Sequence, residues 1–343
     1  MPAPRPARRL LALAAGAVLA AGLAAPAGAA PSDRAPEGAH ARAATTAAER
    51  AAVAAYWTPA RMRAALPGER LAPVVSPTEA AAAAPVARGT TAKVKPVPKP
   101  DKPGGGKPGG GGGGSTDPVV TGALWTGGTA VVATTGKVFF TLGGSNYVCS
   151  GSAVTSANES TVLTAGHCLH EGPGDFATNW AFVPAYADGA RPYGTFVATD
   201  LHTTTQWESS GDFSYDVGFA VVAPVGGATL TDTVGAQGIT FSAPRSESRY
   251  AFGYPAARPY DGSDLVHCAG PLKSDPYGAD TLGMTCDMTG GSSGGPWLSG
   301  FSTSTGLGQL SSVNSYKYST DKTSMYGPYL GTDAQQLYDT ASR

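Results

Sequence analysis

The sequence has little charge and few metal-binding side chains for its length of 343 residues. Only 14% of its residues are Asp, Glu, Lys or Arg, and it contains 4 cysteines and 5 histidines. His167 and His170 have the spacing of half a metal site, but no cluster of Cys, His or carboxylate residues completes it. We therefore expect no metal and no cofactor, and we expect His170 to be an exposed loop residue.

Long apolar runs are also missing after residue 30, so no later segment predicts a membrane span. The first 29 residues instead have a basic start, the small-to-apolar run 10–25 and an A-x-A sequence at Ala27–Ala29. A membrane anchor is disfavoured because the run is short and rich in alanine. We expect a signal peptide at 1–29, a secreted, extracellular protein and no membrane contact after its removal.

The net charge of −1 is divided unevenly along the chain. Residues 1–116 contain 15 Lys or Arg and 6 Asp or Glu, a net charge of +9, whereas residues 117–343 contain 9 and 19, a net charge of −10. Nucleic-acid binding is not expected of the acidic part, because it lacks clustered basic residues. The opposite charges suggest that the N-terminal part docks on the C-terminal part.

Composition divides the remainder into three segments. Residues 30–94 are alanine-rich, with a helix-prone run at 43–55 and a helix start at Thr58-Pro59 that ends at Pro67-Gly68. This segment is interpreted as a propeptide, and two roles stay open: a disordered spacer, or a folding aid or inhibitor that is a partner of its own enzyme. Residues 95–116 are a linker of Pro and Lys followed by Gly.

From residue 117 onward, short β-branched and aromatic runs alternate with glycine-rich turns. Val131–Val132 and residues 138–140 flank Thr134–Gly136 and predict a hairpin, and further strands are predicted at 161–163, 216–222, 296–298 and 310–318. This pattern predicts antiparallel barrels or a sandwich. One helix is predicted at the C-terminus, with Thr332 and Gln335 as its capping box.

Ser293 lies among glycines in the segment Gly290–Pro296, which has the sequence GGSSGGP. A nucleophilic serine needs a tight turn and nearby backbone N–H groups, and glycines permit both. The segment also fits the G-x-S-x-G pattern of α/β-hydrolases, whose acid and histidine follow the serine. Because no histidine follows His267, that interpretation is excluded.

The chain instead has candidate triad residues in the order His, Asp, Ser. His167 lies in the sequence TAGHC at the end of a predicted strand, and Asp216 lies in YDVGFA at the start of another. A buried carboxylate needs a partner, which a histidine base provides. The four cysteines permit three pairings, of which the local ones, Cys149–Cys168 and Cys268–Cys286, close loops worth about 3 kcal/mol each.

These three motifs, in this order, resemble the trypsin-like serine peptidases. Gly253–Pro255 and the cysteine layout are more similar to the bacterial secreted branch near the glutamyl endopeptidases. The resemblance begins near Val119. It implies an all-β domain at 117–343 with two packed antiparallel six-stranded β-barrels and a C-terminal helix, preceded by a largely disordered or helical propeptide and the linker.

The resemblance also implies roles for single residues. Ser293 would attack the substrate carbonyl to form an acyl-enzyme, with His167 as base and Asp216 as its orienting acid. Backbone N–H groups of Gly291 and Ser293 would form the oxyanion hole. Ser315 and Tyr316 would lie on the strand that pairs with substrate backbone. Cys149 resembles one half of the family's first disulfide, paired with the cysteine after the histidine.

Two positions affect activation and specificity. The family usually has Asp before the nucleophile, but this chain has Ser292, so we expect propeptide removal to open the cleft rather than to complete it with a new ion pair. Asp287 lies six residues before Ser293, as the acid of trypsin-type pockets does. Specificity for Arg and Lys and a glutamyl or broad specificity both stay open, as does a surface or paired role for Asp287.

The function predicted from these residues is a serine endopeptidase (hydrolase), made as a precursor, that acts on proteins or peptides. The alternative from another class is a catalytically silent binding protein on the same fold. It is disfavoured because all three triad positions are filled. A monomer is the default expectation.

Overall fold

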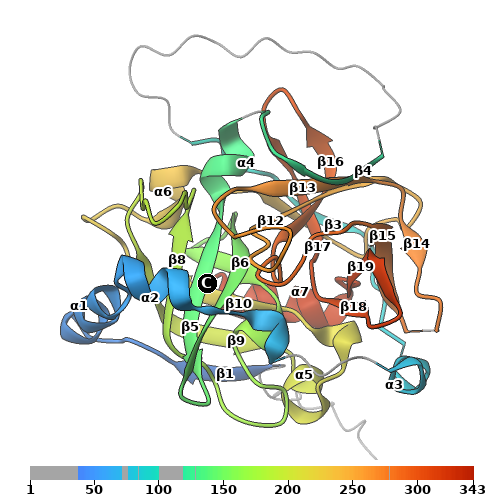
Figure 1. The fold of residues 1–343 in the computed structure, drawn as a ribbon, viewed down its shortest axis with the longest axis horizontal. Coiled ribbons are helices and arrows are strands. Elements are labelled where there is room, and N and C mark those ends of the chain that lie inside the picture. Colours follow the sequence, from blue (N-terminus) through green and yellow to red (C-terminus); the bar gives the residue numbers. More distant parts are fainter. Residues whose placement is uncertain (1–37, 72–75, 84, 100–118, 128, 278) are drawn as a thin grey trace, which may run out of the picture. The chain divides into compact units, whose positions relative to one another are not determined.

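The computed structural model describes residues 38–71, 76–83, 85–99, 119–127, 129–277 and 279–343. The predicted signal peptide, the first residues of the predicted propeptide and most of the predicted linker lie outside these ranges. The described chain is mostly β-structure with few helices (Figure 1). No helix among the described residues has the length and apolar character needed to cross a membrane.

The strands are short and follow one another closely along the chain. They are β1 (Ala39–Arg42), β2 (Leu66–Pro67), β3 (Ala92–Val94), β4 (Val120–Leu124), β5 (Thr135–Leu142), β6 (Ser145–Val154), β7 (Thr161–Thr164), β8 (Thr178–Pro184), β9 (Phe196–Thr203), β10 (Gly218–Val222), β11 (Gly238–Phe241), β12 (Arg249–Gly253), β13 (Val266–Gly270), β14 (Lys273–Ser274), β15 (Thr281–Thr285), β16 (Pro296–Ser302), β17 (Leu307–Val313), β18 (Tyr316–Tyr318) and β19 (Asp321–Pro328).

The helices are mostly one or two turns long and lie between strands. They are α1 (Ala47–Tyr56), α2 (Pro59–Ala64), α3 (Pro77–Ala82), α4 (Thr129–Thr134), α5 (Thr205–Ser210), α6 (Leu230–Val234) and α7 (Thr332–Ala341), with 3-10 turns η1 (Gly68–Arg70), η2 (Gly166–Cys168) and η3 (Phe213–Tyr215).

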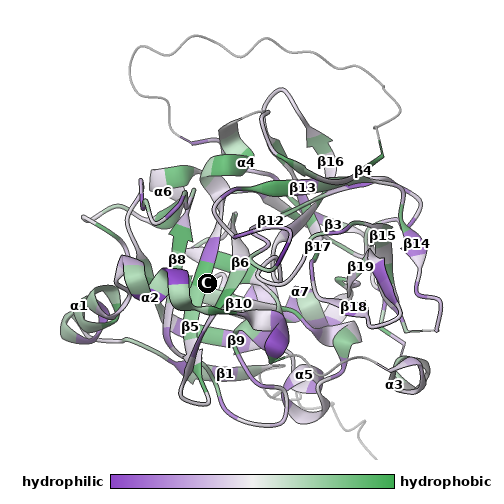
Figure 2. Ribbon diagram, viewed as in Figure 1, coloured by the Kyte–Doolittle hydropathy of each residue, from purple (hydrophilic) through white to green (hydrophobic). Residues whose placement is uncertain are grey.

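Six strands close into an antiparallel barrel. The order is β8-β5-β6-β7-β10-β9, and pairing of β8 with β9 completes the ring. Its strands carry fully buried side chains such as Phe139, Leu163, Phe182 and Phe219. Figure 2 shows the hydrophobic colouring that these strands share. This barrel confirms the predicted all-β fold.

The C-terminal half divides its strands between two sheets. One has the order β3-β11-β17-β16-β12-β13-β4 and the other has the order β14-β15-β19-β18. Trp297 and Met284 are fully buried in the hydrophobic cluster shared by these sheets. The Cys268–Cys286 disulfide joins β13 to the end of β15. Both local cysteine pairings are therefore confirmed.

The predicted C-terminal helix is present as α7, but its cap differs from the prediction. Thr332 is the first helical residue and Gly331 is the N-cap, with no side-chain capping bond. The helix is held instead by its buried face, where Leu337 is 1% exposed. The N-cap is therefore Gly331, one residue before the predicted cap Thr332, and the helix is stabilised by packing rather than by a capping box.

The predicted hairpin at 131–140 is wrong in its first strand. Residues 129–134 form α4, in which Val131 is fully buried and Thr134 Oγ1 donates to the carbonyl of Ala130. The turn that follows β5 lies at Gly143 and Gly144, both with positive φ (54° and 76°). Glycine adopts this conformation without the steric cost that other residues incur.

The N-terminal residues 38–99 supply strands as well as helices to these sheets. β1 pairs with β9, β3 pairs with β11 and β2 pairs in parallel with β6. Thr58 caps α2 as predicted by accepting a hydrogen bond from Arg61 N. Trp57 is fully buried and its Nε1 donates to Asn179 O over 2.6 Å. This region is thus packed on the β-domain along most of its described length.

Candidate active site

His167 is held at the end of β7 by a cross-linked turn. It lies in η2, whose Cys168 is bonded to Cys149 of β6. A Cβ atom at Gly166 would lie 2.9 Å from both Thr203 Oγ1 and Trp207 Cδ1, so glycine lets this turn pack closely. The disulfide and the close packing fix the histidine, as a general base requires.

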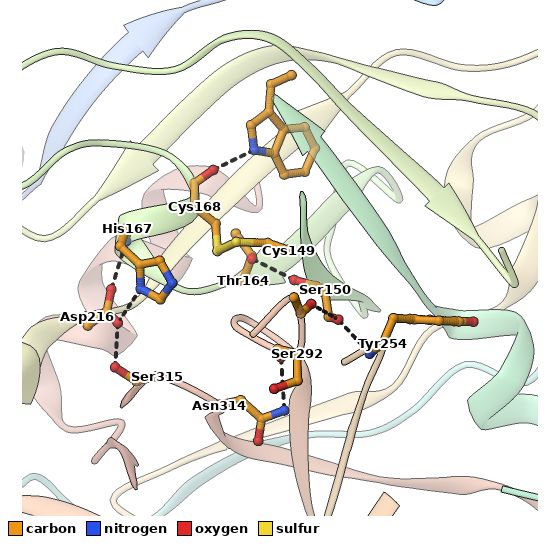
Figure 3. Close-up of a disulfide and its surroundings, with 12 residues drawn as sticks. Cys149, Ser150, Thr164, His167, Cys168, Asp216, Tyr254, Ser292, Asn314 and Ser315 are labelled. Atoms are coloured by element: carbon orange, nitrogen blue, oxygen red, sulfur yellow. Dashed lines mark hydrogen bonds and ion pairs between the residues drawn. A yellow bond between two sulfur atoms is a disulfide. The ribbon is translucent and has the colours of Figure 1, made fainter. Parts of the chain in front are cut away.

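Asp216 meets His167 as the motifs predict (Figure 3). His167 Nδ1 lies 2.8 Å from Asp216 Oδ2, and the His167 backbone N–H donates to Oδ1 over 2.8 Å. Ser315 Oγ also donates to Oδ2, over 2.5 Å. Asp216 is fully buried and His167 is 1% exposed. Three donors thus compensate the burial of one carboxylate.

The loop that carries Ser293 is fastened to the barrel by backbone contacts. Ser150 N donates to Ser293 O over 2.7 Å, and Ser150 Oγ donates to Gly291 O over 2.8 Å. Gly291 has φ +93° and Gly294 has φ +76°, values that glycine adopts readily. A Cβ atom on Gly294 would overlap Thr164 Oγ1, three residues before His167. The loop therefore approaches the strand that leads to the histidine.

The other ring nitrogen of His167, Nε2, is the one that is not bonded to Asp216. Nε2 is buried and has no hydrogen-bond partner among the described residues. Ser293 is 4% exposed. The hydrogen bond between Ser293 and His167 that a catalytic pair forms is thus not made in this conformation, and such bonds often tighten only when substrate binds.

Asp287 is exposed, and its Oδ1 accepts a hydrogen bond from Tyr260 Oη over 2.7 Å. It is therefore not the buried carboxylate that a trypsin-type pocket needs, but a paired surface aspartate. Asp287 follows Cys286, just after β15, whose last residue, Thr285, is also exposed.

Two side chains close to the substrate-strand candidates Ser315 and Tyr316 were not predicted from the sequence. They are Lys317 and Asp275. Lys317 Nζ donates to the carbonyls of Cys286 and Lys322, and burial lowers the pKa of Lys317 to about 8. Tyr316 Oη donates to Asp275 Oδ2 over 2.8 Å, and Asp275 is 7% exposed. No sequence motif marks either group, because both depend on contacts between separate strands.

Residues of the N-terminal region also reach this site. β2 lies beside Tyr147 and Val148 of β6, the two residues before Cys149. A Cβ atom on Gly68 would lie 2.5 Å from Cys149 Sγ, and one on Gly290 would overlap the Glu69 carboxylate. The segment therefore touches both the disulfide beside His167 and the loop that carries Ser293.

Among the described residues, one cluster brings three potential metal ligands together. Cys149, His167 and Cys168 bring their ligand atoms within 4.8 Å of one another, but both sulfurs are used in a disulfide. These residues do not fit a metal ion, because cysteine binds metals as a thiolate and neither sulfur is free to form one. The predicted exposure of His170 is wrong: it is 2% exposed, because its ring packs edge-on against Phe176, and burial lowers its pKa.

Comparison with solved structures finds proteases. The chain is 52% identical to the protease Anisep from Arthrobacter nicotinovorans, with a TM-score of 0.61 over 65% of this chain and 99% of Anisep. It is 46% identical to the thermostable serine protease AL20 from an extremophilic microorganism, with a TM-score of 0.59 over 62% of this chain and 99% of AL20. A Glu endopeptidase shares the fold at 18% identity and a TM-score of 0.52.

Comparison by sequence finds less. No family model matches the chain. An extracellular metalloprotease of Bacillus subtilis (strain 168) is 35% identical over 74 residues, which are 22% of this chain and 23% of that protein. The chain thus spans about a quarter of the length of this relative.

Proposed function

Because this chain belongs to the trypsin-like serine proteases, we propose that it is a secreted serine endopeptidase made as a precursor. His167, Asp216 and Ser293 form its catalytic triad, and proteins or peptides are its substrates. The observation that carries this proposal is the His167 Nδ1–Asp216 Oδ2 contact of 2.8 Å. It reserves Nδ1 for the acid and leaves Nε2 to act as the base.

The reaction follows from these positions. Ser293 Oγ attacks the carbonyl carbon of the scissile bond while its proton passes to His167 Nε2. The tetrahedral oxyanion is stabilised by the backbone N–H groups of Gly291 and Ser293, each worth about 3–4 kcal/mol in such sites. The C–N bond then breaks and Nε2 returns the proton to the leaving amine. Water releases the resulting acyl-enzyme by the same route.

Activity measurements on triad variants test this mechanism against the silent binding protein. Ser293→Ala, His167→Ala and Asp216→Asn should each lower kcat for a peptide substrate by about 10⁴-fold or more. Ser292→Ala is the matched control, because Ser292 Oγ donates to Thr289 O and has no catalytic role in this scheme. Wild-type protein that binds peptides and does not cleave them would favour the binding protein.

Removal of the N-terminal region opens the cleft in this proposal. Ser292 carries no charge, and its hydroxyl is already paired within the loop, so a new N-terminal ammonium has no carboxylate to meet at this position. Chains that begin at residue 117 and a few residues earlier should therefore have equal kcat. An inert longer chain with an open cleft would contradict this.

The exposed Asp287 favours a glutamyl or broad specificity over specificity for Arg and Lys. Its carboxylate is bonded to Tyr260, and Lys317 places a positive charge nearby that repels a basic side chain. Asp287→Ser should leave the ranking of a peptide panel unchanged. A wild-type preference for Arg or Lys that this substitution abolishes would restore the trypsin-type interpretation.

A further inference from the structure

The turn η1 and the strand before it place a short N-terminal segment, Leu66–Arg70, against two parts of the active site. β2 pairs with β6 at Tyr147 and Val148, and Gly68 is buried against the sulfur of Cys149. Figure 1 shows this segment after α2, crossing in front of β6. Two contacts of different kinds, a strand pairing and a close backbone approach, thus fix its position.

Glu69 extends from this segment to the loop that carries the nucleophile. Both of its carboxylate oxygens and its Cδ atom lie where a side chain on Gly290 would begin. Gly290 is buried and is followed by Gly291, the proposed oxyanion donor. Only a residue without a Cβ atom leaves room for this carboxylate.

Three basic side chains lie near the Glu69 carboxyl group. Burial raises its pKa, while the nearby charges of His167, Arg70 and Lys317 oppose that rise. His167 and Lys317 belong to the β-domain. Burial thus favours the neutral form of the Glu69 carboxyl, and the three basic groups favour its charged form.

We propose that the surface of Gly290, next to the proposed oxyanion donor Gly291, binds a carboxyl side chain, and that Glu69 fills this site to inhibit the precursor. This inference rests on the proposed function, because it assigns an inhibitor to that same site. The ligand class is an acidic side chain in an extended peptide that ends in a turn.

The contacts of the segment are those of an inhibitor and differ from those expected of a substrate. The expected substrate strand follows Ser315 and Tyr316, whereas β2 pairs with β6 and runs parallel to it. The peptide bonds of the segment are thus aligned on a different strand from the one assigned to substrate. Glu69 covers the Ser293 loop while its own backbone is held away from the substrate register.

The test is the rate at which a fluorophosphonate labels Ser293 in the intact, uncleaved precursor. Glu69→Ala should raise this rate by about 10- to 100-fold, because the side chain that covers Gly290 is removed, and Glu69→Gln should raise it less. Gly290→Ala should also release the segment, since its methyl group takes the space of the carboxylate. Glu49→Gln is the matched control, because the Glu49 carboxylate accepts hydrogen bonds from Thr45 and Thr46, just before α1; its rate should equal that of the wild type.

Precursor freed of its N-terminal region by limited proteolysis separates the two proposals. If the cleaved chain is labelled rapidly while wild type and Glu69→Ala precursors are labelled equally, the carboxylate site is wrong and the proposed function stands. If the cleaved chain is not labelled at all, the proposed function fails and the inference fails with it. Slow labelling of the wild-type precursor and fast labelling of Glu69→Ala support both.

Discussion

Ser315 Oγ donates a hydrogen bond to Asp216 Oδ2, the same oxygen that contacts His167 Nδ1. Ser315 directly precedes β18, so this bond joins the expected substrate strand to the acid of the triad. Asp216 lies in the barrel half of the chain and Ser315 in the other half. The bond therefore couples the position of the carboxylate to the packing of the two halves.

Removing this bond should reduce the rate of the chemical step. Ser315→Ala is expected to lower kcat by about 10- to 100-fold with little change in KM, since a hydrogen bond to a charged group is worth about 1.5–3 kcal/mol. Ser315→Thr keeps the hydroxyl and should restore most of kcat. Equal kcat for wild type and Ser315→Ala would show that the bond does not position Asp216.

Asp275 is expected to position β18, the proposed substrate strand, through hydrogen bonds to its tyrosines. Its buried carboxylate accepts hydrogen bonds from the hydroxyls of Tyr316 and Tyr318, the two ends of β18. Asp275→Asn should weaken both bonds and raise KM about 5- to 10-fold while kcat changes less. Steady-state kinetics measure the changes in KM and kcat separately. A fall in kcat with an unchanged KM would contradict this role.

Trp57 is expected to anchor the N-terminal region on the barrel. Its indole is fully buried, lies 5.4 Å from the ring of Phe139 and donates to Asn179 O. Trp57→Ala should lower the free energy of unfolding of the intact precursor by about 3–5 kcal/mol, the usual cost of such a truncation. Denaturant unfolding gives this value, and a change below 1 kcal/mol would mean that the region contributes no stability through this contact.

The stability of the precursor should also depend on pH through His202. This ring stacks on His40 of β1 at 4.4 Å, and burial together with the His40 charge lowers the pKa of His202 from 6.5 to about 4. The unfolded chain therefore binds a proton more readily between these values. Stability should be full above pH 6.5 and should fall as the pH decreases toward 4, by at most about 3 kcal/mol.

His202→Phe keeps the stacking surface and removes the titration. The slope of the free energy of unfolding against pH between 4 and 6.5 should therefore be smaller in this variant. His170 and His267 also have lowered pKa values, so part of the slope should remain. An unchanged slope would assign the whole effect to those other groups.

The β-domain and the His167–Asp216 contact could be predicted from the sequence because local signals specify them. Short alternating strands predicted the barrel, and the motifs around His167, Asp216 and Ser293 placed each residue at the end of a strand or in a tight turn. The economical cysteine pairings were correct, and each joins residues close in the sequence, 19 and 18 positions apart.

The packing of the N-terminal region could not be predicted in the same way. β1, β2 and β3 are held by backbone pairing with strands of the β-domain, which small residues such as Ala39 and Ala92 permit without any hydrophobic pattern. The charge difference between the two parts suggested docking but gave no register. The position of Glu69 depends on the space left by Gly290, which only the folded chain defines.

The central claim is that His167 activates Ser293 as a nucleophile. The most direct measurement is fluorophosphonate labelling of the chain freed of its N-terminal region, with the modified residue located by mass spectrometry. We predict labelling at Ser293 alone, none in Ser293→Ala, and labelling of His167→Ala slower by orders of magnitude. A folded, cleaved wild-type chain that is not labelled, or equal labelling of His167→Ala and wild type, would contradict the claim.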